Sequence, residues 1–512
     1  MRNAFGLAAP RLSLFVLTGL LAGLALAQPP VRLPAKAEVH FDQKLQDWDG
    51  FGVNYVEVVN VRDLAEYKKN PQEYGGFSTL SEQKRQEVLD MVFGSDGLKP
   101  GLVKMFQDSL QEGMTEASRG EFDHETTTKW MRYFVAEGLK MTRARGADFQ
   151  IISTMYGPPG WTTKQKIVRG RDLDPTKKED VARYMIHWVK WLRDHEKLPV
   201  KYVSLFNEGE GWNRWPPDGS TGGDLTHDYN MWWPNNQIVD FLHFMRPMMD
   251  KEGLKDVGLT PGETSNWEAF GRWYAPYYWA DPVALKNIGL ITSHGFGLGR
   301  GATNSLGVDT LRHLRPELHA WNTSMTFIPH LWAKGGADTL GDNIFIEQIR
   351  QNIYDAKVNG IIPWSVVQSD PWTGQPNAAA NPYWNEWVGT GFWVDRKGGY
   401  SIDPGYYYYK HVSRAGQPGM AVASATSQDS EVGVIAFGRA GTQNSDALIV
   451  NNLGHVRSVA VKISGTNSQS FEAFLTDPAT KKYYEPMGTV TLHDGVLECS
   501  MPSQSVITFF AK

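Results

Sequence analysis

The sequence has almost no cysteine, no excess of basic residues and no hydrophobic run after its N-terminus that is long enough to cross a membrane. Only one of its 512 residues is cysteine, Cys499, so no disulfide can form within the chain. Lys and Arg total 51 against 56 Asp and Glu, which gives a formal net charge of −5. Without a basic surplus to neutralise phosphates, nucleic acid is not an expected partner. The balanced charge also argues against a chain that is disordered throughout.

One strongly apolar run lies at the N-terminus. Arg2 and Arg11 accompany an apolar stretch over residues 14–26, and residues 25–27 (Ala-Leu-Ala) fit a small-residue cleavage site. This pattern predicts a signal peptide, whose removal would leave 512 − 27 = 485 residues. A membrane anchor is the alternative, but the run is short for a span of about 20 residues. We therefore expect a secreted or periplasmic protein with no membrane partner after cleavage.

Short apolar runs alternate with longer amphipathic stretches between residues 50 and 414. This alternation predicts a (β/α)8 TIM barrel with long loops. Strands are expected at residues 52–58, 102–106, 149–155, 202–206, 257–260, 290–293, 318–323 and 360–364. Helices are expected at residues 81–92, 126–143, 178–195 and 344–357. A doubly wound sheet is the alternative, but the glycine-rich phosphate turn that usually follows its first strand is missing.

After residue 414 the pattern changes to short strand-like runs separated by Gly, Asn and Asp, which predicts a β-sandwich. Its strands are expected at residues 432–437, 447–451, 459–463, 471–475 and 505–510. A strand-like run at residues 37–41 is expected to join this sandwich. The predicted organisation is therefore a signal peptide (1–27), an N-terminal segment (28–49), the barrel (50–414) and the β-sandwich (415–512).

The most specific signal for chemistry follows the fourth predicted strand. Residues at the C-terminal ends of barrel strands form the active sites of TIM-barrel enzymes. Here these residues are Asn207, Glu208 and, two positions on, Glu210. A carboxyl group at such a position can protonate a leaving oxygen, and the neighbouring amide can hydrogen-bond a substrate hydroxyl. The alternative is a carboxylate that caps the next helix.

Other predicted strand ends carry aromatic and titratable residues. Tyr156 and Trp161 belong to a loop rich in Gly and Pro, and Trp364 ends the eighth strand. Sugar rings have apolar faces that stack on such side chains, so these residues suggest carbohydrate binding, with core packing as the alternative. Further candidates at the strand ends are His294, Glu263 and Glu57. For the acids, a buried ion-pair network is the alternative.

Several catalytic motifs are missing. The sequence has no Gly-x-Ser-x-Gly elbow and no P-loop, and its histidines lack a metal-ligand spacing. We therefore expect no metal and no other cofactor.

The order of these motifs resembles glycoside hydrolase family 30, within the large clan of barrel glycosidases. The matching pieces are residues 48–53 (Trp-Asp-Gly-Phe-Gly-Val), 156–161 (Tyr-Gly-Pro-Pro-Gly-Trp), Asn207-Glu208, Trp364 and 503–509 (Ser-Gln-Ser-Val-Ile-Thr-Phe). The similarity spans nearly the whole mature chain. It implies that Glu208 is the general acid/base and that Asn207 binds the hydroxyl next to the scissile carbon.

The sequence departs from the family pattern at the nucleophile. The family places a Glu at the end of the seventh strand, after Trp-x-Thr or Trp-x-Ser. Here residues 321–324 read Trp-Asn-Thr-Ser, so Ser324 stands at the expected Glu position, with Trp321 ahead of it as a substrate-binding candidate. A serine lacks the charge that stabilises an oxocarbenium-like transition state or forms the usual glycosyl-enzyme ester.

Three hypotheses follow from this departure. The first is an inverting glycosidase, with Glu208 as acid and Ser324 leaving room for the attacking water. Its base would be Glu263, or else Glu210 or Glu57. The second is a retaining enzyme whose nucleophile lies elsewhere in the chain or on the substrate. The third is a catalytically inactive carbohydrate-binding protein of glycosidase ancestry.

Overall fold

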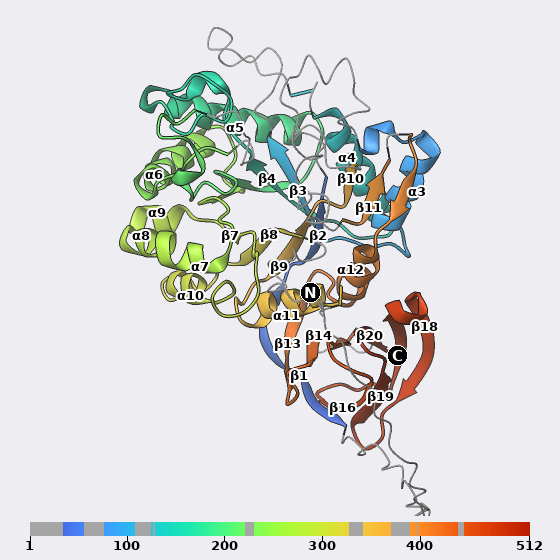
Figure 1. Cartoon of the computed structure of the whole chain (residues 1–512). Helices are drawn as coiled ribbons and strands as arrows, with labels where there is room; N and C mark the ends of the chain where they lie inside the picture. Colours follow the sequence, from blue (N-terminus) through green and yellow to red (C-terminus); the bar gives the residue numbers. More distant parts are fainter. Residues whose placement is uncertain are drawn as a thin grey trace, which may run out of the picture. The chain divides into compact units, whose positions relative to one another are not determined.

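A computed structural model of the chain describes residues 34–55, 76–107, 124–125, 128–220, 230–326, 341–369, 390–395, 397–438 and 445–512. These residues form an eight-stranded barrel sheet, a nine-stranded sheet and a small three-stranded sheet (Figure 1). The TIM barrel with a C-terminal β-rich domain, predicted from the sequence, is therefore confirmed. No helix in the described ranges is long and apolar enough to cross a membrane. The predicted signal peptide lies outside these ranges.

The barrel sheet has the strand order β6-β5-β4-β3-β2-β9-β8-β7, and all its pairings are parallel. Its strands are β2 (Gly50–Asn54), β3 (Leu102–Gln107), β4 (Gln150–Met155), β5 (Val200–Ser204), β6 (Gly258–Thr260), β7 (Ile291–Ser293), β8 (Ala320–Thr326) and β9 (Gly360–Trp364). Bridges from Leu259 to Ile288 and from Thr264 to Ser293 join the two end strands and close the barrel. Each predicted strand overlaps an observed one, because strands covered on both faces are short apolar runs.

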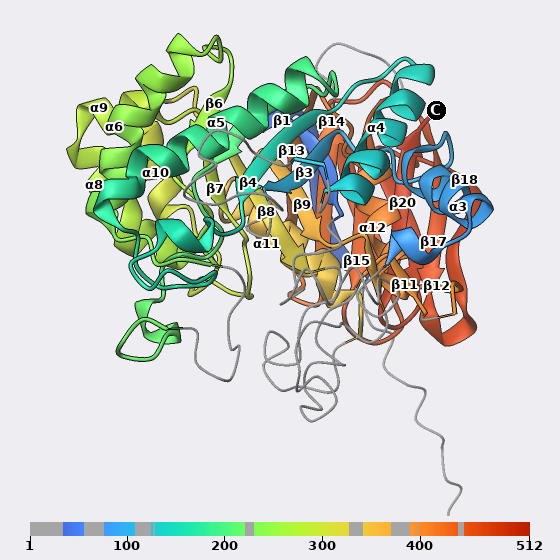
Figure 2. The same cartoon turned by 90° about the horizontal axis from the view of Figure 1, so that it is seen from above.

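Helices surround the barrel strands (Figures 1 and 2). They are α3 (Glu82–Phe93), α4 (Lys129–Ala144), α5 (Lys178–Asp194), α6 (Asn235–Lys251), α7 (Trp267–Ala269), α8 (Ala275–Ala280), α9 (Pro282–Asn287), α10 (Leu306–Arg312), α11 (Ile344–Tyr354) and α12 (Pro404–Ala415). Short turns of helix add η1 (Phe77–Thr79), η2 (Gly160–Thr162), η3 (Pro175–Lys177), η4 (Trp212–Arg214) and η5 (Phe270–Tyr274). On α5 the core residues Val181, Met185, Trp188 and Leu192 recur at helical spacing, which is why the helix covers the strands.

The inside of the barrel is layered. An apolar cluster consists of Leu102, Ile152, Tyr202, Leu290, Trp321 and Ile362, each on or beside a different strand. Each of these residues is followed, two positions later in the sequence, by a member of a second set: Lys104, Thr154, Ser204, Thr292, Thr323 and Trp364. Alternate side chains along a strand share a face, so this second set lies nearer the C-terminal ends. The apolar cluster therefore forms the floor beneath a mostly polar layer.

The nine-stranded sheet has the order β18-β17-β20-β15-β14-β13-β1-β16-β19. Its strands are β1 (Ala35–Trp48), β13 (Met420–Ser427), β14 (Val432–Gly438), β15 (Ala447–Asn452), β16 (Arg457–Ser464), β17 (Ser470–Asp477), β18 (Lys482–Thr491), β19 (Val496–Met501) and β20 (Ser505–Ala511), with η6 (Pro478–Thr480) after β17. β1 pairs antiparallel with β13 and parallel with β16, so the chain ahead of the barrel belongs to this sheet.

Both faces of this sheet are buried at its centre. On β14, Val434 and Ala436 belong to the core of the sheet itself, whereas Ile435 and Phe437 belong to the core shared with the barrel. Helices α11 and α12 contact β14 and β15 respectively. The strands β13, β18 and β19 were not predicted, and β18 is mostly exposed, so its sequence lacks a strong apolar pattern. The small third sheet consists of β10 (Val367–Ser369), β11 (Phe392–Val394) and β12 (Tyr400–Ile402).

Candidate active site

Glu208 lies just beyond the C-terminal end of β5, where backbone hydrogen bonds hold it to the loop after β6. The Glu208 N–H donates to the Glu263 carbonyl at 2.8 Å, and the Glu263 N–H donates to the Phe206 carbonyl at 2.9 Å. Glu208 has a φ of 44°, in the left-handed region that residues other than glycine seldom adopt. Backbone strain of this kind gathers at functional sites, and it persists only where the surroundings enforce it.

Two basic side chains hold the Glu208 carboxylate. Its Oε1 lies 2.8 Å from His294 Nδ1, and its Oε2 accepts a hydrogen bond from Arg214 Nη1 at 3.0 Å. The Glu208 side chain is 17% exposed. Burial raises its pKa, but His294 and Arg214 outweigh burial and lower the pKa to about 2. Glu208 is therefore an anion at neutral pH.

Glu263 follows β6 and is fully buried inside the barrel. Lys104 Nζ lies 2.5 Å from Glu263 Oε2, and Thr154 Oγ1 donates to Glu263 Oε1 at 2.6 Å. Burial raises the pKa of Glu263, but the charge of Lys104 and then the hydrogen bond from His294 lower it to about 2. A catalytic base needs a carboxylate oxygen that is not already engaged by other groups, so that it can accept a hydrogen bond from water. This sealed ion pair does not suit the role of base that the sequence suggested for Glu263.

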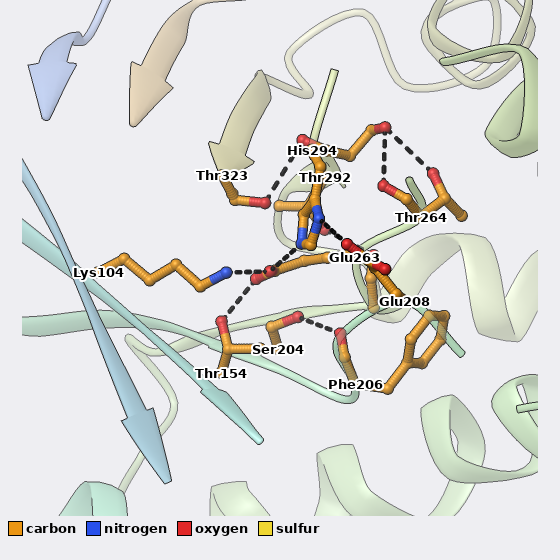
Figure 3. Close-up of polar contacts among 12 residues, drawn as sticks. Lys104, Thr154, Ser204, Phe206, Glu208, Glu263, Thr264, Thr292, His294 and Thr323 are labelled. Carbon is orange, nitrogen blue, oxygen red and sulfur yellow. Dashed lines mark hydrogen bonds and ion pairs between the residues drawn. The ribbon is translucent and has the colours of Figure 1, made fainter. Parts of the chain in front are cut away.

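The imidazole of His294, just after β7, lies between the two carboxylates (Figure 3). Its Nε2 lies 3.3 Å from Glu263 Oε2, and its backbone N–H donates to the Thr264 carbonyl at 2.7 Å. The side chain is 2% exposed. Burial lowers the pKa of His294, but the hydrogen bonds with Glu208 and Glu263 outweigh burial and raise it. Only the protonated ring can donate to a carboxylate from both nitrogens.

These side chains form a row in which the sign of the charge alternates. The order is Lys104, Glu263, His294, Glu208 and Arg214, with each neighbouring pair in contact. Such a row can hold a proton on the imidazole beside a carboxylate that is partly exposed to solvent. Within the described ranges, no three His, Cys, Asp or Glu side chains are grouped as a metal site requires.

Glu210 lies close to this row and is tied to Ser265. The Ser265 N–H donates to Glu210 Oε1 at 2.6 Å, and Arg214 Nη2 donates to Ser265 Oγ at 3.3 Å. Glu210 Oε2 is buried and has no hydrogen-bond partner among the described residues. A buried carboxylate oxygen in this state is costly. It is able to accept a hydrogen bond from a water molecule or a substrate hydroxyl.

Asn207 and two predicted aromatic residues lie around the same end of the barrel. Asn207 is buried, and its backbone forms a bridge with Glu263. Tyr156 and Trp364 each meet the ring of Phe106 edge to face, at centroid distances of 5.1 and 5.7 Å. Lys104 Nζ lies 4.5 Å from the centroid of that ring. The indole nitrogen of Trp161, on η2, is buried and forms no hydrogen bond in the described structure, and Lys177 Nζ lies 5.7 Å from its ring centroid.

Three candidates remain, and one of them lies outside the described residues. Trp321 belongs to the apolar floor, and its Nε1 donates to Asp49 Oδ2 at 2.6 Å. Ser324 is buried within β8 rather than at its end, because the strand continues to Thr326. Glu57 lies outside the described residues.

The sequence analysis missed Lys104, Thr154 and Arg214. Lys104 carried a usable signal, since it is the one charged residue in the strand Leu102–Gln107. A lysine inside a fully buried strand needs a buried partner, and this points to a carboxylate on the opposite side of the barrel. Arg214 comes from the loop after β5, and no pattern in the sequence sets it apart from other surface arginines.

No family model matches the sequence, and no curated protein does either. Solved structures do match. A family 30 endoxylanase from Clostridium papyrosolvens C71 is 16% identical, with a TM-score of 0.63 over 93% of this chain and 100% of that one. The catalytic domain of the family 30 xylanase C from Talaromyces cellulolyticus is also 16% identical, with a TM-score of 0.67 over the same shares.

A third match acts on a different polymer. It is an endo-beta1,6-glucanase, 14% identical to this chain, with a TM-score of 0.63 over 93% of this chain and 94% of that one. At these identities the likeness concerns the fold and leaves the substrate open. The resemblance seen in the sequence is confirmed at that level: the chain has the fold of the glycoside hydrolase family 30 xylanases.

Proposed function

We propose that the protein is an exported glycoside hydrolase that cleaves O-glycosidic bonds of an oligo- or polysaccharide, with Glu208 as the general acid. One observation carries the proposal. Glu208 is a partly exposed carboxyl group at the C-terminal end of a glycosidase-type barrel, and an imidazole lies 2.8 Å from it. In this fold class, the active site lies at that end of the barrel. Asn207 beside it supplies an amide for a sugar hydroxyl.

The second catalytic group differs from the one that the sequence favoured. An inverting enzyme needs a carboxylate that activates water, at roughly 6.5–9.5 Å from the acid. Glu263 is sealed by Lys104 and Thr154, whereas Glu210 Oε2 has no partner in the described structure. We therefore place Glu210 ahead of Glu263 as the base, and Glu57 remains a candidate. Ser324 offers no carboxylate for a covalent intermediate, so we expect inversion.

The test compares the wild-type protein with Glu208→Gln on a panel of plant and microbial polysaccharides. Loss of the acid should lower turnover by roughly 10²–10⁴-fold while the fold is unchanged. The matched control is Glu252→Gln, which makes the same change at an exposed ion pair with Lys190 on the outside of the barrel. The control should keep full activity. Equal turnover in Glu208→Gln and the wild type would refute the assignment of Glu208.

Proton NMR of the first product formed gives the stereochemistry. An inverted anomer supports a water-activating carboxylate, and Glu210→Gln should then lose activity as well. A retained anomer would reject the inverting mechanism. The first group to attack the anomeric carbon would then be a nucleophile of the protein or the substrate, not a water molecule activated by Glu210, Glu263 or Glu57.

A sugar-binding protein without turnover is the second candidate. It is favoured by Ser324 on β8 and by the burial of Glu263, which together leave the barrel centre without an accessible second carboxylate among the described residues. Tight oligosaccharide binding without any product, across the whole panel, would support this candidate. Release of reducing ends that depends on Glu208 would exclude it.

A further inference from the structure

Glu208 is ionised in the unliganded protein, but a general acid has to carry a proton when the substrate binds. The nearest group that can supply one is His294, whose Nδ1 lies 2.8 Å from Glu208 Oε1. An imidazole in water would be mostly neutral above pH ~6.5. The surroundings of His294 decide whether it keeps its proton at higher pH.

Those surroundings are anionic on both sides of the ring. Among the described residues, the charged groups around His294 are Glu208 and Glu263, in contact with it, and Lys104 and Arg214 one step further out. Phe296 covers the ring edge to face, at a centroid distance of 5.1 Å. Glu263 is fully buried, so water does not screen its charge as it would at the surface.

We propose that Glu263 is a positioning residue that keeps His294 doubly protonated, so that His294 stores the proton that Glu208 delivers to the leaving oxygen. Lys104 balances the charge of Glu263 and holds its carboxylate in place. This inference rests on the proposed function for its catalytic meaning, but the protonation of His294 can be measured without turnover.

The proton balance is simple. When a sugar binds, the Nδ1 proton passes to Glu208 Oε1, which gives a neutral imidazole and a neutral carboxylic acid. The carboxylic acid gives that proton to the glycosidic oxygen as the bond from this oxygen to the anomeric carbon breaks. Water adds to the anomeric carbon and gives one proton to the base. The base then releases that proton to the solvent, and His294 takes up one proton, which restores the imidazolium and leaves the site unchanged.

The first test is the titration of His294 by NMR of the ring nitrogens in the full protein, with the signals assigned by their loss in His294→Gln. In the wild type both ring nitrogens should stay protonated above pH ~6.5. Glu263→Gln should lower the midpoint by about 1–3 pH units, because the anion at Nε2 is lost. Lys104→Met should raise the midpoint, since it removes a cation and leaves Glu263 charged.

The midpoint of His294 is expected to fall in Glu263→Gln and to rise in Lys104→Met, and this difference distinguishes an effect of charge from a loss of structure. Unfolding around the site would move His294 towards the ordinary value in both variants. His319 is an internal control, since its Nδ1 lies 2.7 Å from Asp49 in a separate ion pair, so its titration should not change in either variant. A neutral His294 at pH 7 in the wild type would overturn the inference, and so would an unchanged midpoint in Glu263→Gln.

Activity gives the second readout. The wild type should lose kcat/KM as the pH rises through the midpoint of His294, and Glu263→Gln should show this loss at lower pH. Full turnover with an unshifted profile would leave the proposed function standing and overturn the role of Glu263. If the NMR midpoints shift as expected but no substrate is hydrolysed, the role of Glu263 in keeping His294 protonated is supported, and the proposed hydrolysis is not.

Discussion

Glu208 Oε1 and His294 Nδ1 lie 2.8 Å apart, although 86 residues separate them in the sequence. The two residues follow β5 and β7, which the barrel brings to the same end. Each group shifts the pKa of the other towards its charged form, downwards for the carboxyl and upwards for the imidazole. The contact is therefore strongest at a pH where both groups are charged.

The pH dependence of stability should reflect this contact. Glu208 and Glu263 have pKa values lowered from 4.5 to about 2, so their stabilisation is present above pH 4.5 and is lost as the pH falls towards 2. The pKa of His294 is raised above 6.5, so its stabilisation is complete below pH 6.5 and is lost as the pH rises through the folded value.

The free energy of unfolding, measured in urea, should therefore contain a site contribution that is largest between pH 4.5 and 6.5. His294→Gln should weaken the alkaline decline, and His319, whose pKa is also raised, accounts for part of what remains. An alkaline decline of equal size in His294→Gln and in the wild type would contradict this account.

Lys104→Met should destabilise the protein by about 3–5 kcal/mol, because it leaves the buried Glu263 without its ammonium partner. The matched control is Lys190→Met, which breaks an ion pair of similar length, 2.6 Å, with Glu252 at the surface. Surface pairs contribute only about 0–1 kcal/mol. Urea denaturation of both variants checks the prediction, and an equally small loss of stability in the two variants would contradict it.

Gly262→Ala should disturb the site directly. Gly262 has a φ of 104°, and a Cβ at this position would lie 2.0 Å from a ring atom of Phe206. We expect a loss of at least about 1–3 kcal/mol from backbone strain alone, and a displaced Glu263. Gly253→Ala is the control, since its φ is 82° but no atom lies within 4 Å of the added carbon. Thermal unfolding should show a clearly larger effect at residue 262, and equal shifts would exclude the steric clash.

Trp48→Ala should loosen the contact between the barrel and the nine-stranded sheet. The indole is buried against Phe51 and Phe437, at centroid distances of 4.8 and 5.1 Å, and its Nε1 donates to the Gly416 carbonyl at 2.9 Å. Removing it should cost about 3–5 kcal/mol. Trp212→Ala, which removes an exposed indole, should stay within about 0.5 kcal/mol. Calorimetry of the two variants measures both losses of stability, and a loss in Trp48→Ala as small as that in Trp212→Ala would show that Trp48 does not hold the two parts together.

The barrel could be predicted because its strands are short, apolar and regularly separated by amphipathic helices. The strand 102–106 was clear for this reason, whereas β18 was not, because exposed strands show little apolar alternation. Glu208 and His294 could be found from their places after predicted strands. The row of alternating charges from Lys104 to Arg214 could not be predicted, because the pairing of Lys104 with Glu263 depends on the geometry of the closed barrel.

The roles of individual site residues were harder to predict than their positions. Trp321 was expected to bind substrate because it stands ahead of the position at which the family places its nucleophile, but its side chain belongs to the apolar floor. Two residues along a strand separate the floor from the polar layer, and the sequence does not show at which residue each strand reaches the rim. Glu263 follows β6, as expected, but only the structure shows that Lys104 and Thr154 engage its two carboxylate oxygens.

The pairing of β1 with β13 and β16 has a consequence for the order in which the chain folds. On a ribosome, residues 35–48 emerge long before the two strands that flank them, which begin at residues 420 and 457. This β-strand therefore has no partner until most of the protein has been made, and contacts of such sequence separation form slowly. An exposed edge of this kind is prone to aggregation during synthesis. Moving β1 to the C-terminus by circular permutation should therefore speed refolding and reduce aggregation.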